Sequence, residues 1–200
     1  AIGQKPQLAF AFEKSYKMLA LIGLPLAVGI GVMAFPLMRL LGPDGHLDPS
    51  IPALQVLAPS VVLLFVNNAF IYTLTAIDRQ ADFTRLALVT LAVNVGLNLV
   101  LIPAYGLIGA AIASTLTELA LFAGGWWLLR QQQLRLGVLS SIGRVALSAA
   151  AMGAVVYLVR SWALILVALV GVAVYALALF AFRALSAEEW AIVRSGLMAR

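Results

Sequence analysis

The sequence contains no cysteine, a single histidine and few charged residues. The absence of cysteine excludes disulfides, thiolate metal ligands and cysteine nucleophiles. The one histidine, His46, lies in residues 42–50 among glycines and prolines, which is typical of a solvated turn. No nucleophile or metal-binding set accompanies it, so we predict that the chain is not an enzyme and holds no metal or organic cofactor.

Charged residues make up only 10% of the chain, against 64% hydrophobic residues and a mean hydropathy of +1.05. Soluble domains carry about a quarter charged residues, so this composition predicts an integral membrane protein. The formal net charge of +5 comes from basic residues scattered between apolar runs. Because they form no dense cluster, nucleic-acid binding is not expected.

Six apolar runs follow one another, each near the roughly 20 residues that cross a membrane. They occupy residues 16–41, 51–76, 83–102, 107–129, 140–159 and 163–182. We therefore predict an all-α membrane protein with a six-transmembrane-helix bundle at residues 16–183, after a cytoplasmic lead-in at residues 1–15. Residues 184–200 should form a cytoplasmic tail, either frayed or an interfacial helix.

The basic residues also predict an orientation. With the amino end in the cytoplasm, only Arg39 and Arg160 of the 13 lysines and arginines would lie outside. This distribution follows the positive-inside rule, and the reverse orientation would violate it at nearly every loop. Both ends of the chain are therefore expected in the cytoplasm.

The first run contains helix-disrupting residues within its apolar sequence. Pro25 removes a backbone hydrogen bond, and Gly29 and Gly31 follow it closely. A bend here would let these three residues act as a hinge that gates a transport path. The alternative is a bend that only packs against neighbouring helices.

The sequence NVGLNLVLIPAYGLIGAAIAS, at residues 94–114, predicts a membrane hairpin. Asn94 and Asn98 are four residues apart and share one helix face. Pro103 and Gly106 bracket the turn, and the small residues that begin with Gly109 permit close approach of the returning helix. Helix packing around a polar interior is therefore expected.

This hairpin resembles the C-terminal half of polysaccharide exporters and lipid-linked oligosaccharide flippases in the multidrug/oligosaccharidyl-lipid/polysaccharide superfamily. Residues 21–41, LIGLPLAVGIGVMAFPLMRLL, resemble the seventh helix of that family, and residues 115–122, TLTELALF, resemble the continuation of its tenth. The resemblance covers most of the chain.

The resemblance implies a flippase lobe in a bacterial-type inner membrane. Its partners would be a missing N-terminal lobe, membrane lipids and a lipid-linked glycan, which the two lobes would translocate by alternating access. The absence of an initial methionine agrees with the expectation of a longer parent protein. A coupling ion, either a proton or sodium, is expected from the same resemblance.

Glu118 is the only acidic residue inside a predicted span. A charge there is unfavourable unless it is paired, hydrated or neutralised, so intramembrane acids are functional candidates. Ser114 and Thr115 precede Glu118 by four and three positions and should share its face. One reading gives this face a role in ion coupling, and the other gives a protonated Glu118 a packing role.

Other polar residues could line a path for the sugar head group. Asn94 and Asn98 form one stripe, and Asn68 and Tyr72 form another on the second run. Their neutral donors and acceptors suit sugar hydroxyls, although each could instead join neighbouring helices. Arg39 could contact a diphosphate, or simply extend to the membrane interface.

Two other functions fit the same sequence features. A multidrug exporter driven by cations would have a more aromatic and acidic cavity than this asparagine-rich hairpin suggests. A noncatalytic membrane scaffold for glycan synthesis would use the polar stripes only to pack helices. Translocation of substrate separates both transporters from the scaffold.

Overall fold

The computed structural model describes residues 4–132 and 138–185, with side chains described at residues 7–132 and 142–185. This part of the chain is helical and has no β-strand. Its elements are α1 (Gln4–Leu41), the short 3-10 helix η1 (Asp48–Ser50), α2 (Ile51–Ala76), α3 (Gln80–Gln131), α4 (Val138–Val159) and α5 (Leu164–Ala181). The five long helices are all apolar enough to cross a membrane, so the predicted all-α membrane fold is confirmed.

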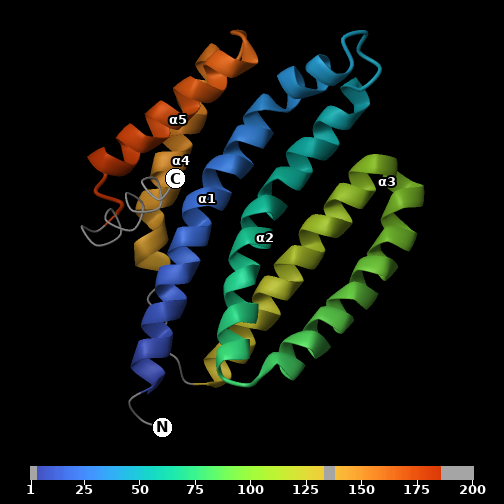
Figure 1. The fold of residues 1–200 in the computed structure, drawn as a ribbon. Helices are drawn as coiled ribbons and strands as arrows, with labels where there is room; N and C mark the ends of the chain where they lie inside the picture. The colour runs from blue at the N-terminus through green and yellow to red at the C-terminus, as the bar shows by residue number, and fades with distance from the viewer. Residues whose placement is uncertain (1–3, 133–137, 186–200) are drawn as a thin grey trace, which may run out of the picture.

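Helix α3 is a hairpin rather than a single crossing. Its 52 residues would extend about 78 Å as one straight helix, more than twice the hydrocarbon thickness of a bilayer. Gly106 interrupts the helix with φ 56° and ψ −130°, a backbone conformation that glycine adopts readily and other residues rarely do. The first arm, residues 80–105, and the return arm, residues 107–131, lie side by side in Figure 1. The five helices therefore provide the six predicted crossings.

The hairpin closes tightly beside the turn. A Cβ atom on Gly109 would lie 2.1 Å from the backbone oxygen of Leu101, so only glycine permits this approach. Further along, Gly124 of the return arm faces Leu86 of the first arm, and a Cβ on Gly124 would come within 2.3 Å of that side chain. The predicted role of small residues in bringing the arms together is confirmed.

The helices form a row in which α1 and α2 are central (Figure 1). Helix α1 packs against α2 on one side and against α4 on the other, and α5 packs mainly against α4. The return arm of α3 contacts α2 at Gly125. The Phe70 ring of α2 fills the space that a Cβ atom on Gly125 would occupy. The first arm of α3 therefore lies at one edge of the row, and α4 and α5 lie at the other.

An aromatic cluster joins the beginning of α1 to α2 and α3. The Phe12 and Phe70 ring centroids are 5.5 Å apart, and Phe70 meets Phe122 edge to face at the same distance. Phe12 is 1% exposed. Because this burial stabilises the start of α1, the helix begins at Gln4 and includes most of the residues expected as a lead-in. The predicted tail beyond Leu185 lies outside the described residues.

The connections at one end of the bundle are short. The loop between α1 and α2, the turn at Gly106 and the turn between α4 and α5 all lie at the upper end in Figure 1. Arg39, in the last turn of α1, and Arg160, directly after α4, belong to this end. The other described basic residues belong to the first half of α1, to the connection between α2 and α3, to the end of α3, to the start of α4 and to the segment after α5, all toward the opposite end: Lys14, Lys17, Arg79, Arg85, Arg130, Arg144 and Arg183.

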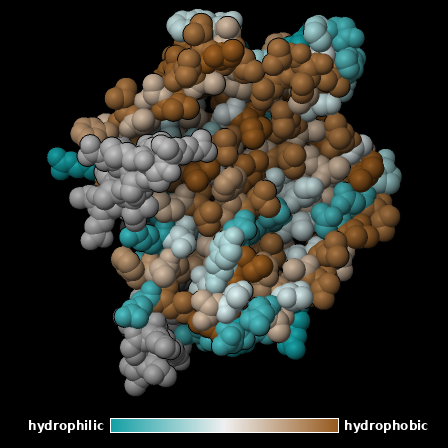
Figure 2. Space-filling view, viewed as in Figure 1, coloured by the Kyte–Doolittle hydropathy of each residue, from teal (hydrophilic) through white to brown (hydrophobic). Residues whose placement is uncertain are grey.

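The surface between the two ends is mainly apolar. Figure 2 shows hydrophobic side chains over much of the visible face, with hydrophilic ones at the upper loop, in smaller patches at mid-height and near the lower edge. Leu99, Val100 and Leu158 are each about 70% or more exposed. Such surfaces suit hydrocarbon rather than water, and the chain is accordingly a multi-pass membrane protein.

Candidate functional site

Glu118 lies near the middle of the return arm of α3 and meets Asn67 of α2. The Nδ2 atom of Asn67 donates a hydrogen bond of 2.7 Å to the Glu118 carboxylate, and it lies 3.1 Å from the Glu118 backbone oxygen. Asn67 is 4% exposed. This contact joins two helices that run in the same direction, because each begins at the upper end of the bundle in Figure 1.

The pair has more acceptors than donors. Asn67 Oδ1 is buried and accepts no hydrogen bond within the described residues, and no lysine or arginine described there forms an ion pair with Glu118. A buried acceptor without a donor costs about 1–3 kcal/mol. An additional donor or a cation beside Asn67 Oδ1 would satisfy this acceptor.

Thr115 and Ser114 point toward different neighbours. The Thr115 hydroxyl lies 3.0 Å from the backbone oxygen of Val56 on α2, and 2.9 Å from that of Ala111 in its own helix. Ser114 lines a hollow of about 280 Å³ between the return arm and the adjoining ends of α1 and α2. Thr115 thus faces α2 with Glu118, whereas Ser114 borders the hollow.

The two asparagines of the hairpin form a polar link between its arms. Asn94 Nδ2 donates to the Thr117 hydroxyl oxygen at 2.9 Å. Asn98 Nδ2 lies 2.9 Å from the backbone oxygen of Asn94 and 3.0 Å from its side-chain oxygen. Both asparagines border a hollow of about 350 Å³ on the first arm. The hairpin thus brings Asn94 of the first arm to Thr117 of the return arm.

Asn68 and Tyr72 lie on a different face of α2 from Asn67. Asn68 donates to the backbone oxygen of Leu64 in its own helix, and Tyr72 is 68% exposed. The predicted stripe therefore exists, but it does not join Glu118. Sequence spacing drew attention to Asn68 and Tyr72 because they are four residues apart. In the structure Ser60, Asn67 and Leu74 are buried on one face of α2, and nothing in the sequence distinguishes this face from the one that contains Asn68.

Arg39 is held within the upper loop. Its Nη2 atom forms an ion pair with Asp48 at 2.5 Å, and its guanidinium lies over the Phe35 ring. In the same loop, the hydrogen bond from His46 holds the pKa of Asp44 below its usual value. Arg39 thus has an internal partner, and this loop does not place it beside Glu118.

The predicted hinge residues of α1 lie within one uninterrupted helix. Both prolines, Pro25 and Pro36, occur inside α1 without ending it. A Cβ on Gly31 would lie 3.5 Å from the Ala58 side chain, an ordinary packing distance, whereas a Cβ on Gly29 would meet open space. Pro25 and Gly29 border an apolar groove between α1 and α5.

Comparisons with known proteins relate this geometry to a transporter fold. No family model matches the chain. An uncharacterized membrane protein of Methanocaldococcus jannaschii, MJ1068, is 26% identical over 129 residues, which are 64% of this chain and 25% of that protein. The inward closed conformation of the lipid II flippase MurJ superposes with a TM-score of 0.74 at 17% identity.

The chain shares the fold of part of a lipid flippase. The superposition covers 90% of this chain and 40% of the MurJ chain. The chain thus spans well under half the length of either protein that it resembles.

Proposed function

We propose that this chain is one lobe, the C-terminal one, of a flippase that moves a lipid-linked oligosaccharide or polysaccharide precursor across the cytoplasmic membrane. The observation that carries this proposal is the MurJ-like arrangement of nearly the whole chain. The hairpin resemblance favours a glycan-linked substrate. A second lobe would complete a path in which the head group stays among polar side chains while its lipid tail stays in hydrocarbon.

The contact between Asn67 and Glu118 gives this lobe a means of ion coupling. In one state the Asn67 amide donates to the Glu118 side chain, as in the structure. In the other state, a proton or sodium ion binds between the Glu118 carboxylate and the side-chain oxygen of Asn67 and supplies a positive charge. Because Asn67 is on α2 and Glu118 on α3, a change between these states alters how two helices are joined. Such a change could bias alternating access.

The experiment is translocation of a fluorescent lipid-linked oligosaccharide by the full-length protein in liposomes. Glu118→Gln keeps the size of the side chain but removes its charge. A coupling role predicts at least about tenfold slower translocation, or loss of its dependence on pH or sodium, at normal protein abundance. Asp78→Asn is the matched control, because Asp78 lies in an exposed turn at φ 58°, a conformation that asparagine tolerates.

Two outcomes would contradict separate parts of this proposal. Unchanged translocation by Glu118→Gln, with the original pH and ion response, would assign Glu118 to packing. Absence of translocation by the wild type would favour a membrane scaffold. The scaffold has one observation behind it, since Asn94, Asn98 and Thr117 all form hydrogen bonds within the hairpin.

A further inference from the structure

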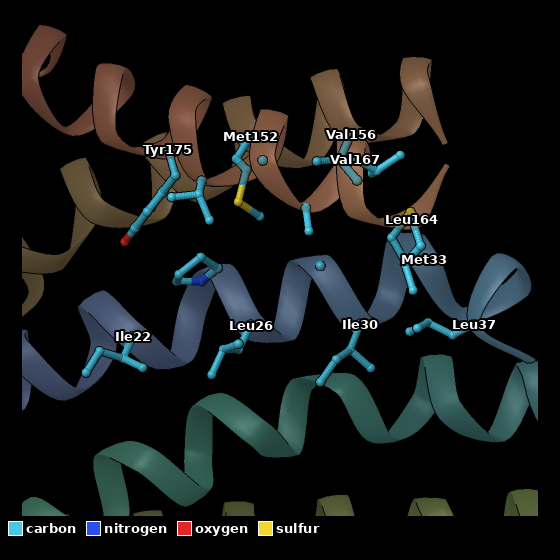
Figure 3. A pocket seen from close by; sticks show the side chains of 15 residues that line it. Ile22, Leu26, Ile30, Met33, Leu37, Met152, Val156, Leu164, Val167 and Tyr175 are labelled. Atoms are coloured by element: carbon cyan, nitrogen blue, oxygen red, sulfur yellow. The ribbon is translucent and has the colours of Figure 1, made fainter. Parts of the chain in front are cut away.

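A long apolar groove separates α1 from α5, with α4 behind it (Figure 3). Its volume is about 460 Å³. Ile22, Leu26 and Met33 line it from α1, Met152 from α4, and Val167 and Val172 from α5. The Tyr175 hydroxyl already donates a hydrogen bond of 2.8 Å to the backbone oxygen of Leu21. The groove is therefore suited to hydrocarbon.

Contacts between α1 and α5 hold the two helices together at both ends of the groove, and the space between these contacts is open. At one end, Tyr175 of α5 is bonded to Leu21 of α1. At the other, Met33 belongs to a buried cluster with Val167. Between these contacts α1 presents Gly29, where a Cβ atom would meet nothing within 4 Å. The missing side chain leaves room between two helices that are held in place.

The groove is long enough for a lipid chain. Its lining on α1 runs from Ile22 to Leu37, which corresponds to about 22 Å at 1.5 Å per residue. This length exceeds half of the roughly 30 Å hydrocarbon core of a bilayer, so an extended acyl chain of one leaflet can lie along it.

A free cation lies beyond the end of the groove that contains Leu164. Arg160 follows Val156, a lining residue, by one helical turn, and its guanidinium lies 4.0 Å from the centroid of the Tyr157 ring. Within the described residues Arg160 has no carboxylate partner, unlike Arg39, which is paired with Asp48. A positive charge at the end of an apolar groove complements an anionic head group attached to an acyl chain.

We propose that this groove binds an acyl chain of an anionic membrane phospholipid, with the phosphate of that lipid contacted by Arg160. The apolar lining accounts for the acyl chain, and the cation accounts for the head group. This site lies on the opposite side of α1 from α2 and is separate from the pair formed by Asn67 and Glu118. The bound lipid is a resident component of the fold and not the translocated substrate.

The test is native mass spectrometry of the full-length protein released from nanodiscs that contain equal amounts of phosphatidylglycerol and phosphatidylcholine. The wild type should retain phosphatidylglycerol preferentially. Gly29→Phe should lose the retained lipid, because its ring fills the middle of the groove. Gly96→Phe is the matched control and should retain lipid as the wild type does, since Gly96 also faces open space but lies on the first arm of α3.

Arg160→Gln keeps the groove intact and tests the head-group contact separately. It should reduce the preference for phosphatidylglycerol over phosphatidylcholine about tenfold, the effect of losing one charge-assisted hydrogen bond. Arg85→Gln, at the opposite end of the bundle, should leave that preference unchanged. Equal phosphatidylglycerol retention by the wild type, Gly29→Phe and Arg160→Gln would overturn the proposal.

Other occupants of the groove give different results in a cysteine experiment. The chain has no cysteine, so a label or crosslink at Ala168→Cys, inside the groove, is assigned without ambiguity. Disulfide-linked dimers at this position would show that a second copy covers the groove. Resistance to a small membrane-permeant thiol reagent after delipidation would show that another segment of the protein fills it. Either result would overturn the proposal, whereas lipid-dependent protection would support it. None of these readouts depends on transport.

Discussion

Asn67 and Asn68 are neighbours in the chain with opposite environments. Asn67→Ala removes the amide donor of the Glu118 carboxylate, whereas Asn68→Ala removes only a bond to its own helix. We expect Asn67→Ala to reduce the free energy of unfolding by about 1–3 kcal/mol and Asn68→Ala to change it little. Thermal unfolding of the purified protein measures both.

The double substitution Asn67→Leu with Glu118→Leu isolates the interaction further. Replacing both polar partners by apolar side chains removes the unpaired groups, so the double variant should be more stable than the single variant Asn67→Leu. Strictly additive losses would show that the two side chains do not interact.

Sequence reasoning found Glu118 because an acid is rare inside an apolar span. It missed Asn67, since a helix dense in apolar residues has no clear polar face from which burial can be deduced. Asn68 and Tyr72 gave a regular pattern, yet that face is exposed. Which side of α2 meets α3 depends on long-range packing, which the spacing of residues within α2 does not specify.

The hairpin of α3 depends on glycine at two places with different demands. Gly106 supplies the backbone conformation of the turn, and Gly109 supplies the space beside Leu101. Gly109→Ala should lower the free energy of unfolding by about 1–3 kcal/mol, because the added methyl group forces the arms apart. Gly96→Ala should be neutral or slightly stabilising in the same thermal assay, since its Cβ meets open space.

The hydrogen bond between Asn94 and Thr117 also joins the two arms of α3. Thr117→Val removes the hydroxyl while keeping the branched shape, and should destabilise the protein by about 0.6 kcal/mol. Thr84→Val is the control, because Thr84 bonds to Gln80 of its own helix. Equal effects of the two substitutions would show that the link between the arms contributes no net stability.

The helices themselves were predictable because an apolar run of about 20 residues is long enough to cross a membrane. The turn of α3 was also predictable, since Pro103 and Gly106 lie between two such runs. The start of α1 was not, because residues 4–15 have too many polar side chains to resemble a span. Their helix is stabilised by the contact of Phe12 with Phe70, which is distant in sequence.

For the whole molecule, the charge distribution predicts that the upper end in Figure 1 lies outside the cell. A single cysteine in place of His46 should react with a membrane-impermeant maleimide applied to intact cells. A cysteine in place of Asp78, in the turn between α2 and α3, should react only after permeabilisation. The opposite labelling pattern would reverse the orientation.

The order of the helices across the molecule could not be predicted from sequence. Every span is apolar on several faces, so hydrophobicity alone does not specify which faces meet. The gap between α1 and α5 depends on Tyr175 reaching the backbone of Leu21, a contact across 154 positions. The groove is consequently a property of the assembled bundle.

The internal hydrogen bonds of α3 have a consequence for biosynthesis. A ribosome delivers the first arm to the translocon before the return arm has been made, so Thr117 is not yet present to accept from Asn94. The Asn98 amide, however, binds to Asn94 within the same arm. This local bond satisfies part of the polarity of the arm during insertion. The first arm therefore enters the bilayer with the Asn94 amide donor still unpaired. When the return arm arrives, Thr117 accepts this hydrogen bond and removes the cost of the unpaired donor. This favours lateral release of the two arms as a pair.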